Sequence, residues 1–234
     1  MGVTKPLGNY SALPSVPEEL QSIIKTDKDD TTGTFPGVIM LNEKFTESAM
    51  RSSLQNKFSL VHVASHFRFS PGDETKSFLL LGDGKELTLD RIKNAPGMFR
   101  GVDLLTLSAC NTAAYGSDAD GKEVEGFGEL AQRQSARSVI VSLWPIVDSS
   151  TAILMAKFYK LTKETTGVSK GQALRQAQLS LLRGNYIATS SFASNTRGDD
   201  QHHASGGSSF SYDPAKPFAH PHYWAPFVMI GNWR

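Results

Sequence analysis

The sequence has few cysteines, little excess charge of either sign and no long apolar run, which argues against several classes of protein. It has a single cysteine, Cys110, so it cannot form an internal disulfide. Its 24 Lys and Arg residues nearly balance 23 Asp and Glu, and a net charge of +1 gives no electrostatic case for direct binding to nucleic acid or to an anionic membrane. No apolar run approaches the roughly 18 residues of a transmembrane helix, and the start lacks a signal-peptide core. We therefore expect a globular, cytoplasmic protein.

Apolar runs alternate with amphipathic helical patterns along the chain. The runs SLVHVA (59–64), DLLTLSA (103–109) and SVIVSLW (138–144) are almost continuously apolar, as is typical of strands covered by helices on both faces. The alternation predicts one α/β domain over residues 1–234, a three-layer sandwich with a mostly parallel sheet. Residues 1–12 are expected to form an extended lead-in, and residues 184–222 a long, partly disordered insertion loop.

Three residues are predicted to cap the helices that follow them. Thr46 and Ser169 each stand just before an amphipathic helical pattern. Ser15 also precedes one, and its spacing to Glu18 is that of a capping box.

Three reactive side chains follow the three apolar runs. His66 comes shortly after the first run, Cys110 directly after the second, and Asp148 after the third. Because the carboxyl ends of parallel strands meet at one edge of a sheet, we expect an imidazole, a thiol and a carboxylate there. Asp103 begins its strand, so it should lie at the opposite edge, and we exclude it.

Each of these residues also has a purely structural interpretation. A lone cysteine is often a small buried apolar residue, His66 could be a hydrogen-bonded structural histidine, and Asp148 could cap the following helix. Their expected position at the same edge of the sheet favours a catalytic role, because an imidazole can take the proton of a thiol. His62 lies inside its run and is expected to be a buried core histidine. His62 and His66 have the i, i+4 spacing of a metal pair on a helix, but they stand in an apolar, β-branched run. The histidines near the end of the sequence could bind metal only weakly, because no cysteines or acidic cluster accompany them, so we expect neither a metal nor an organic cofactor.

Several motifs in order resemble one known family. LSACNTA (107–113), SLWPIVDSST (142–151) and HPHYWAPFVMIG (220–231) are similar to segments of the CHAT domain, and the resemblance runs over residues 13–233. CHAT domains are caspase-like, related to caspases and separase, and often appended to tetratricopeptide repeats. The resemblance implies a caspase-type α/β fold and a catalytic dyad of His66 and Cys110. It also implies that Asp148, with Trp144, lines a pocket for a basic substrate side chain.

The expected activity is therefore that of a cysteine endopeptidase cutting a protein after a basic residue. Backbone N–H groups of Cys110 and Phe67 would hold the oxyanion, although related enzymes commonly have glycine where Phe67 stands. An activating protein partner or repeat region would control it. A catalytically silent scaffold of the same fold is the alternative, favoured by Phe67. A small-molecule cysteine hydrolase is a third possibility, but nothing in the sequence resembles the oxyanion loops that are usual in such enzymes.

Overall fold

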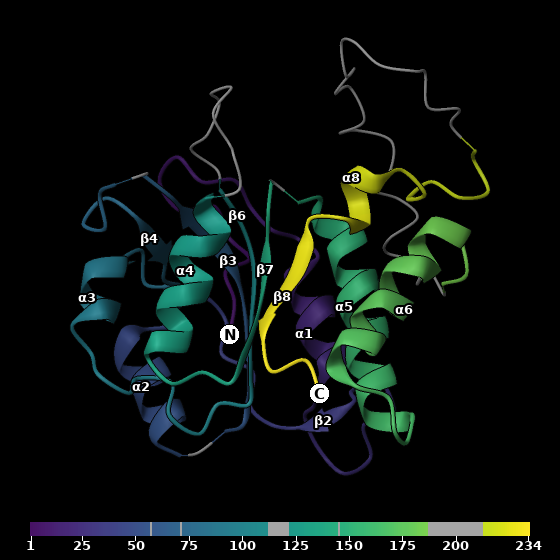
Figure 1. The fold of residues 1–234 in the computed structure, drawn as a ribbon, viewed down its shortest axis with the longest axis horizontal. Helices are drawn as coiled ribbons and strands as arrows, with labels where there is room; N and C mark the ends of the chain where they lie inside the picture. The colour runs from purple at the N-terminus through teal and green to yellow at the C-terminus, as the bar shows by residue number, and fades with distance from the viewer. Residues whose placement is uncertain (57, 71, 112–121, 145, 187–212) are drawn as a thin grey trace.

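A six-stranded sheet forms the middle layer of the protein (Figure 1). The computed structural model describes residues 1–56, 58–70, 72–111, 122–144, 146–186 and 213–234, with only the backbone at residues 110, 111 and 122–125. From one edge to the other, the strands of this sheet are β5 (Glu86–Thr88), β4 (Phe78–Leu80), β3 (Leu60–Arg68), β6 (Leu104–Asn111), β7 (Ser138–Ser142) and β8 (Phe227–Gly231).

Helices cover both faces of this sheet, as Figure 1 shows. One face carries α2 (Glu47–Gln55), α3 (Leu89–Lys93) and α4 (Lys122–Arg133). The other carries α1 (Val16–Ile23), α5 (Asp148–Glu164), α6 (Lys170–Arg183) and the short α8 (Pro221–Trp224). A two-stranded sheet, β1 (Ile24–Lys25) with β2 (Phe35–Pro36), and a 3-10 turn, η1 (Asn42–Lys44), lie between α1 and α2 in the sequence. The predicted α/β sandwich is confirmed.

Only the centre of the sheet is parallel. Strands β3, β6 and β7 run in the same direction, whereas β4, β5 and β8 pair antiparallel to their neighbours. The prediction of a mostly parallel sheet is thus correct for the centre and wrong for the edges. For β4 and β5 the reason lies in their connection, a tight turn with Gly84 at φ 81°, which only an antiparallel pair allows.

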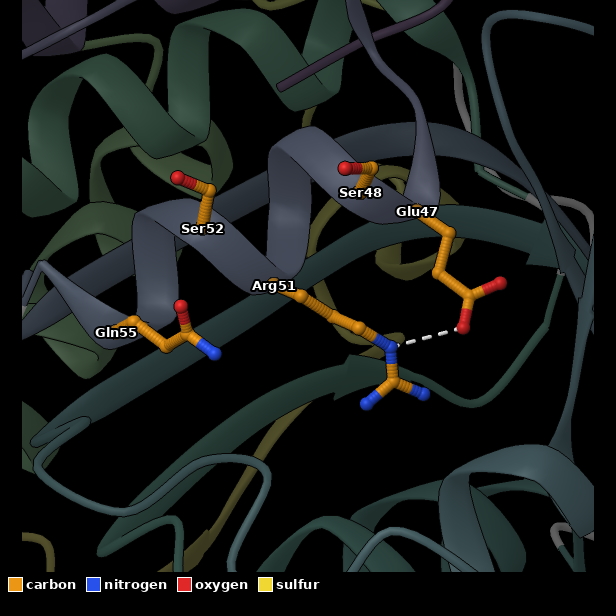
Figure 2. A pocket seen from close by; sticks show the side chains of 5 residues that line it. All are labelled: Glu47, Ser48, Arg51, Ser52 and Gln55. Atoms are coloured by element: carbon orange, nitrogen blue, oxygen red, sulfur yellow. Dashed lines mark hydrogen bonds and ion pairs between the residues drawn. The ribbon is translucent and has the colours of Figure 1, made fainter.

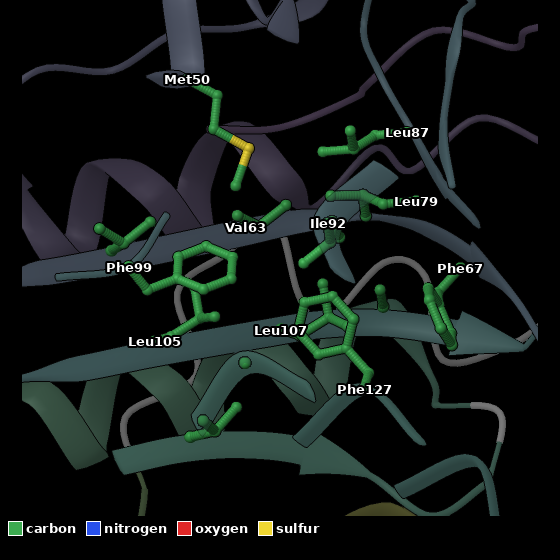
Figure 3. Close-up of a cluster of buried hydrophobic side chains, with 14 of the residues drawn as sticks. Met50, Val63, Phe67, Leu79, Leu87, Ile92, Phe99, Leu105, Leu107 and Phe127 are labelled. Atoms are coloured by element: carbon green, nitrogen blue, oxygen red, sulfur yellow. The ribbon is translucent and has the colours of Figure 1, made fainter. Parts of the chain in front are cut away.

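Strand β3 is longer than its apolar run. The run ends at Ala64, but the strand continues to Arg68. Its pairing with β6 runs on to Phe67, which lies opposite Asn111, and β4 pairs with the last two residues, Phe67 opposite Leu79 and Arg68 opposite Phe78. The Phe67 side chain is buried and packs edge to face on Phe127 of α4 in the core cluster of Figure 3. Phe67, which comes after the apolar run, therefore lies inside the sheet.

Two of the three predicted helix caps are confirmed. The Thr46 hydroxyl accepts from Ala49 N at the start of α2, and Ser169 forms a capping box with Gln172 at the start of α6. The capping box predicted for Ser15 and Glu18 is wrong, since the Ser15 side chain makes no cap hydrogen bond. A carboxylate from far along the chain uses the Ser15 backbone instead.

The two segments expected to be irregular have several fixed contacts. Gly2 forms bridges with Ala64 of β3 and with Leu41, so the start of the lead-in lies along the sheet. Within the expected insertion loop, residues 187–212 lie outside the described residues. Phe218 is buried against the cluster beneath α5 and α6, and α8 begins at Pro221. No helix in the described ranges is long and apolar enough to cross a membrane.

Candidate active site

His66 and Cys110 occupy facing positions on adjacent parallel strands. In the pairing of β3 with β6, the Cα atom of His66 is the register partner of that of Cys110, near the carboxyl ends of both strands. Neighbouring strands lie about 4.8 Å apart, so the two backbone positions are as close as a sheet allows. The expected juxtaposition of these two residues is thus a property of the sheet's register.

The His66 ring is held by one hydrogen bond. Its Nε2 lies 2.9 Å from the carbonyl oxygen of Ser11, and because a carbonyl only accepts, Nε2 must carry the proton. That tautomer leaves a lone pair on Nδ1. This nitrogen is buried and has no hydrogen-bond partner among the described residues. A basic nitrogen without a partner is costly in a purely structural histidine and is what a proton acceptor requires.

Burial also favours the neutral form of this imidazole. His66 is 2% exposed, and the ring of Tyr10 lies 5.1 Å away, tilted by 38°. Desolvation lowers the pKa of His66, and the hydrogen bond to Ser11 opposes that shift. The ring is therefore neutral at pH 7, the form that can accept a proton.

His62, four residues earlier on β3, has hydrogen-bond partners at both ring nitrogens. Its Nε2 lies 2.8 Å from Glu19 and its Nδ1 lies 3.1 Å from the Tyr159 hydroxyl, which also bonds to Thr106 at 2.8 Å. Burial raises the pKa of Tyr159, so this hydroxyl stays protonated and the cluster keeps its hydrogen bonds. Both nitrogens of His62 are occupied, as expected for a core histidine.

Asp148 is the first residue of α5, and its carboxylate contacts α1. Its Oδ2 accepts from the Ser15 backbone N–H at 2.6 Å, at the N-cap of α1. It forms no ion pair with any residue that the structure describes. Burial raises the pKa of Asp148 to about 6, the hydrogen bonds from Ser15 work against this, and the charge of Glu19 adds to it. Its carboxylate therefore holds the neighbouring helix α1, rather than capping α5.

Trp144 and Phe67 line another region, on the α4 side of the sheet. They border a small cavity of about 20 Å³ together with Phe127 and residues of β6 and β7. The Trp144 indole N–H donates to the carbonyl of His222 at 3.1 Å. The structure does not bring the side chains of Trp144 and Asp148 into one described pocket, and the substrate-binding role of both stays a prediction, as does the oxyanion role of the Phe67 N–H.

The shallow pocket of Figure 2 carries none of the candidate residues. It runs along α2, and its charged groups, Glu47 and Arg51, already pair with each other at 2.9 Å. Within the described ranges, no three His, Cys, Asp or Glu side chains are grouped as metal ligands would be.

The residues that sequence reasoning missed are Tyr10 and Ser11. They lie 55 or more positions before His66 in the chain, in a segment expected to be a simple lead-in. Ser11 contributes only a backbone carbonyl, which every residue has, so no sequence signal could have identified it.

Comparison with known protein families gives one match. The family model described as CHAT domain matches residues 4–232, nearly the whole chain. Among curated proteins, no sequence matches this chain.

Proposed function

Because the chain belongs to the CHAT domain family, which is related to caspase-like peptidases, we propose that it is a cysteine endopeptidase with Cys110 and His66 as its catalytic dyad. The observation that carries this proposal is the register of β3 and β6, in which the two residues are partners. The unpartnered Nδ1 of His66 supports it, because it supplies a proton acceptor beside the cysteine's position.

In the proposed reaction, Nδ1 of His66 takes the proton of the Cys110 thiol, and the thiolate sulfur attacks the carbonyl carbon of the scissile peptide bond. The oxyanion would be held by the backbone N–H groups of Cys110 and Phe67. The imidazolium then returns its proton to the leaving amine as the C–N bond breaks. Water, activated by the same nitrogen, hydrolyses the acyl-enzyme. The Ser11 carbonyl stabilises the imidazolium by accepting from Nε2–H.

We also propose that the substrate is cut after a basic residue, with Asp148 and Trp144 in the pocket that accepts this side chain. The carboxylate of Asp148 is largely buried, has no ion pair among the described residues, and has a pKa raised to about 6. A guanidinium placed beside it would supply the missing charge and could bind it through two parallel hydrogen bonds.

One observation favours the silent scaffold as a second candidate. His66 is 2% exposed beneath Tyr10, so a peptide does not reach it directly in this conformation. An activating protein partner or an appended repeat region that moves Tyr10 would reconcile the dyad with this burial. A scaffold would keep Tyr10 in place permanently.

Labelling with a peptidyl electrophile that ends in arginine separates these candidates. An endopeptidase should form one adduct on Cys110, located by mass spectrometry of tryptic peptides, and His66→Ala should label far more slowly. Iodoacetamide, which needs no substrate pocket, serves as the control for simple access to the thiol. If the peptidyl reagent labels wild type and His66→Ala at the same rate, the dyad is not functional.

A further inference from the structure

Residues 4–15 form a loop, here called the 4–15 strap, that is attached to the rest of the protein at both ends. At its first end, Asn42 Oδ1 accepts from Thr4 N at 2.8 Å, and Asn42 Nδ2 donates to Thr4 Oγ1 at 2.8 Å. At its last end, Asp148 accepts from Ser15 N at 2.6 Å. The two anchors are polar side chains from separate parts of the chain, η1 and α5.

The middle of the 4–15 strap touches the candidate base directly. The Ser11 carbonyl accepts from His66 Nε2, and the Tyr10 ring packs against the imidazole. Among the described residues, the Ser11 carbonyl is the only hydrogen-bond partner of this ring, since Nδ1 has none. The position of the strap therefore decides which nitrogen of His66 carries the proton.

The link from Ser11 to the Asp148 anchor is short and stiff. Only three residues separate Ser11 from Ser15, and one of them is Pro14, whose ring restricts its own φ and the conformation of Leu13. Leu13 N also donates to Thr4 O at 3.2 Å, which closes the base of the loop. A displacement at Ser15 is thus transmitted to Ser11 with little slack to absorb it.

We propose that the 4–15 strap positions the His66 ring. Its anchors, Asn42 and Asp148, act as positioning residues for this histidine. Without them the Ser11 carbonyl would leave Nε2, and the ring would be free to flip or to move its proton to Nδ1. A ring with Nδ1–H cannot accept a thiol proton at that atom. Asp148 would then serve the reaction through Ser15 and Ser11, whether or not it also meets substrate.

The inference can be tested first without any peptidase activity, so its failure is separable from that of the proposed function. Nitrogen NMR of the full chain reports the tautomer of each histidine, and His66→Gln assigns the His66 signals. Wild type should show Nε2–H at His66. Asp148→Ala should raise the Nδ1–H population several-fold, whereas Asp148→Asn should not, because its amide oxygen can still accept from Ser15 N. Asn42→Gly should resemble Asp148→Ala; glycine suits the positive φ of 50° at this position.

The kinetic arm rests on the proposed function. Because Asp148 is also proposed to line the substrate pocket, the quantity that separates the two roles is kcat. Asp148→Ala should lower kcat about tenfold, as expected for one lost hydrogen bond acting on the base, and Asp148→Asn should restore kcat. A pocket role alone gives the opposite result: both variants would lose the preference for arginine, mainly through KM.

Asp30→Ala is the matched control, because Asp30 holds the loop between α1 and β2 by similar backbone contacts to Thr26, Thr32 and Gly33. It should leave the His66 tautomer unchanged. The proposal is overturned if folded Asp148→Ala and Asn42→Gly keep the wild-type tautomer, or if Asp30→Ala changes it equally.

Discussion

The first and second halves of β3 each carry a buried histidine, His62 and His66, and the two rings differ in their hydrogen bonds. His62 and His66 are both buried and, being four residues apart in a strand, belong to the same face of the sheet. Glu19 and Tyr159 occupy both nitrogens of His62, whereas His66 keeps one nitrogen without a described partner. Burial alone therefore does not distinguish a structural histidine from a candidate catalytic one, but hydrogen-bond satisfaction does.

The difference follows from what lies opposite each residue. His62 faces Thr106 on β6, a hydroxyl that completes a closed cluster of hydrogen bonds through Tyr159. His66 faces Cys110. A closed cluster stabilises the fold and cannot release a proton acceptor, while an incomplete one costs stability and leaves a base available.

The largest expected effect is on peptide cleavage, through His66 in the second half of β3 and its partner Cys110. Cys110→Ala and His66→Ala should each lower peptide cleavage by roughly a thousandfold or more, because the nucleophile and its base act as a unit. Turnover of an arginine-containing fluorogenic peptide measures this, and circular dichroism checks that the variants fold. Full turnover by a folded Cys110→Ala protein would contradict the dyad.

The next effect is on stability in the His62 half. His62→Ala should lower the free energy of unfolding by about 3–5 kcal/mol, because it leaves the buried Glu19 without its partner. His66→Ala should lower it by less, since it removes one hydrogen bond and the packing on Tyr10 but leaves no buried carboxylate without its partner. Urea denaturation of both variants gives the two values. Equal losses would show that the two halves of β3 do not differ in this way.

A smaller effect is expected when a single atom is removed from the hydrogen-bonded cluster around His62. Tyr159→Phe removes the hydroxyl that bonds to both His62 and Thr106, and should lower the free energy of unfolding by about 1–2 kcal/mol. Thr162→Ala is a suitable control because, among the residues that the structure describes, its hydroxyl donates to one carbonyl of the same helix, α5. If the two substitutions cost the same, the cluster contributes no more than an ordinary helix-surface hydroxyl.

The last prediction concerns the pH dependence of stability at Asp148, the anchor of the 4–15 strap. The pKa of Asp148 is raised from 3.8 to about 6 in the folded protein, so between these values the folded state binds more protons than the unfolded state. Asp148 therefore adds stability as pH falls from about 7 to 4. The lowered pKa of His66 acts in the opposite direction below its unfolded value, so wild type must be compared with a variant at each pH.

Asp148→Asn removes this titration. Its Tm should exceed that of wild type by several degrees at pH 7, where the buried charge is present, and the difference should vanish near pH 4. Differential scanning fluorimetry across this range measures it. A difference that grows toward pH 4 would mean that the carboxylate is stabilised by the fold, contrary to the raised pKa.

Much of the fold could be predicted because its signals are local. The three central strands are apolar runs, and the caps of α2 and α6 are Ser or Thr directly before a helical pattern. The end of β3 was harder to predict, since its last residues follow the apolar run and are fixed by pairing with β6 and β4. The Ser15 cap failed for the same kind of reason, because Asp148 reaches it from 133 positions away.

In the candidate site, too, some features follow from the sequence and others only from the tertiary structure. The sequence alone determined that His66 and Cys110 follow neighbouring apolar runs and that His62 belongs to the core, because strand periodicity and the order of elements are written locally. Only the tertiary structure decided that these two residues are register partners, that the Ser11 carbonyl chooses the tautomer of His66, and that Asn42 and Asp148 hold the strap carrying it. A backbone carbonyl has no sequence signature, and its contact with a ring 55 residues away exists only once the chain has folded.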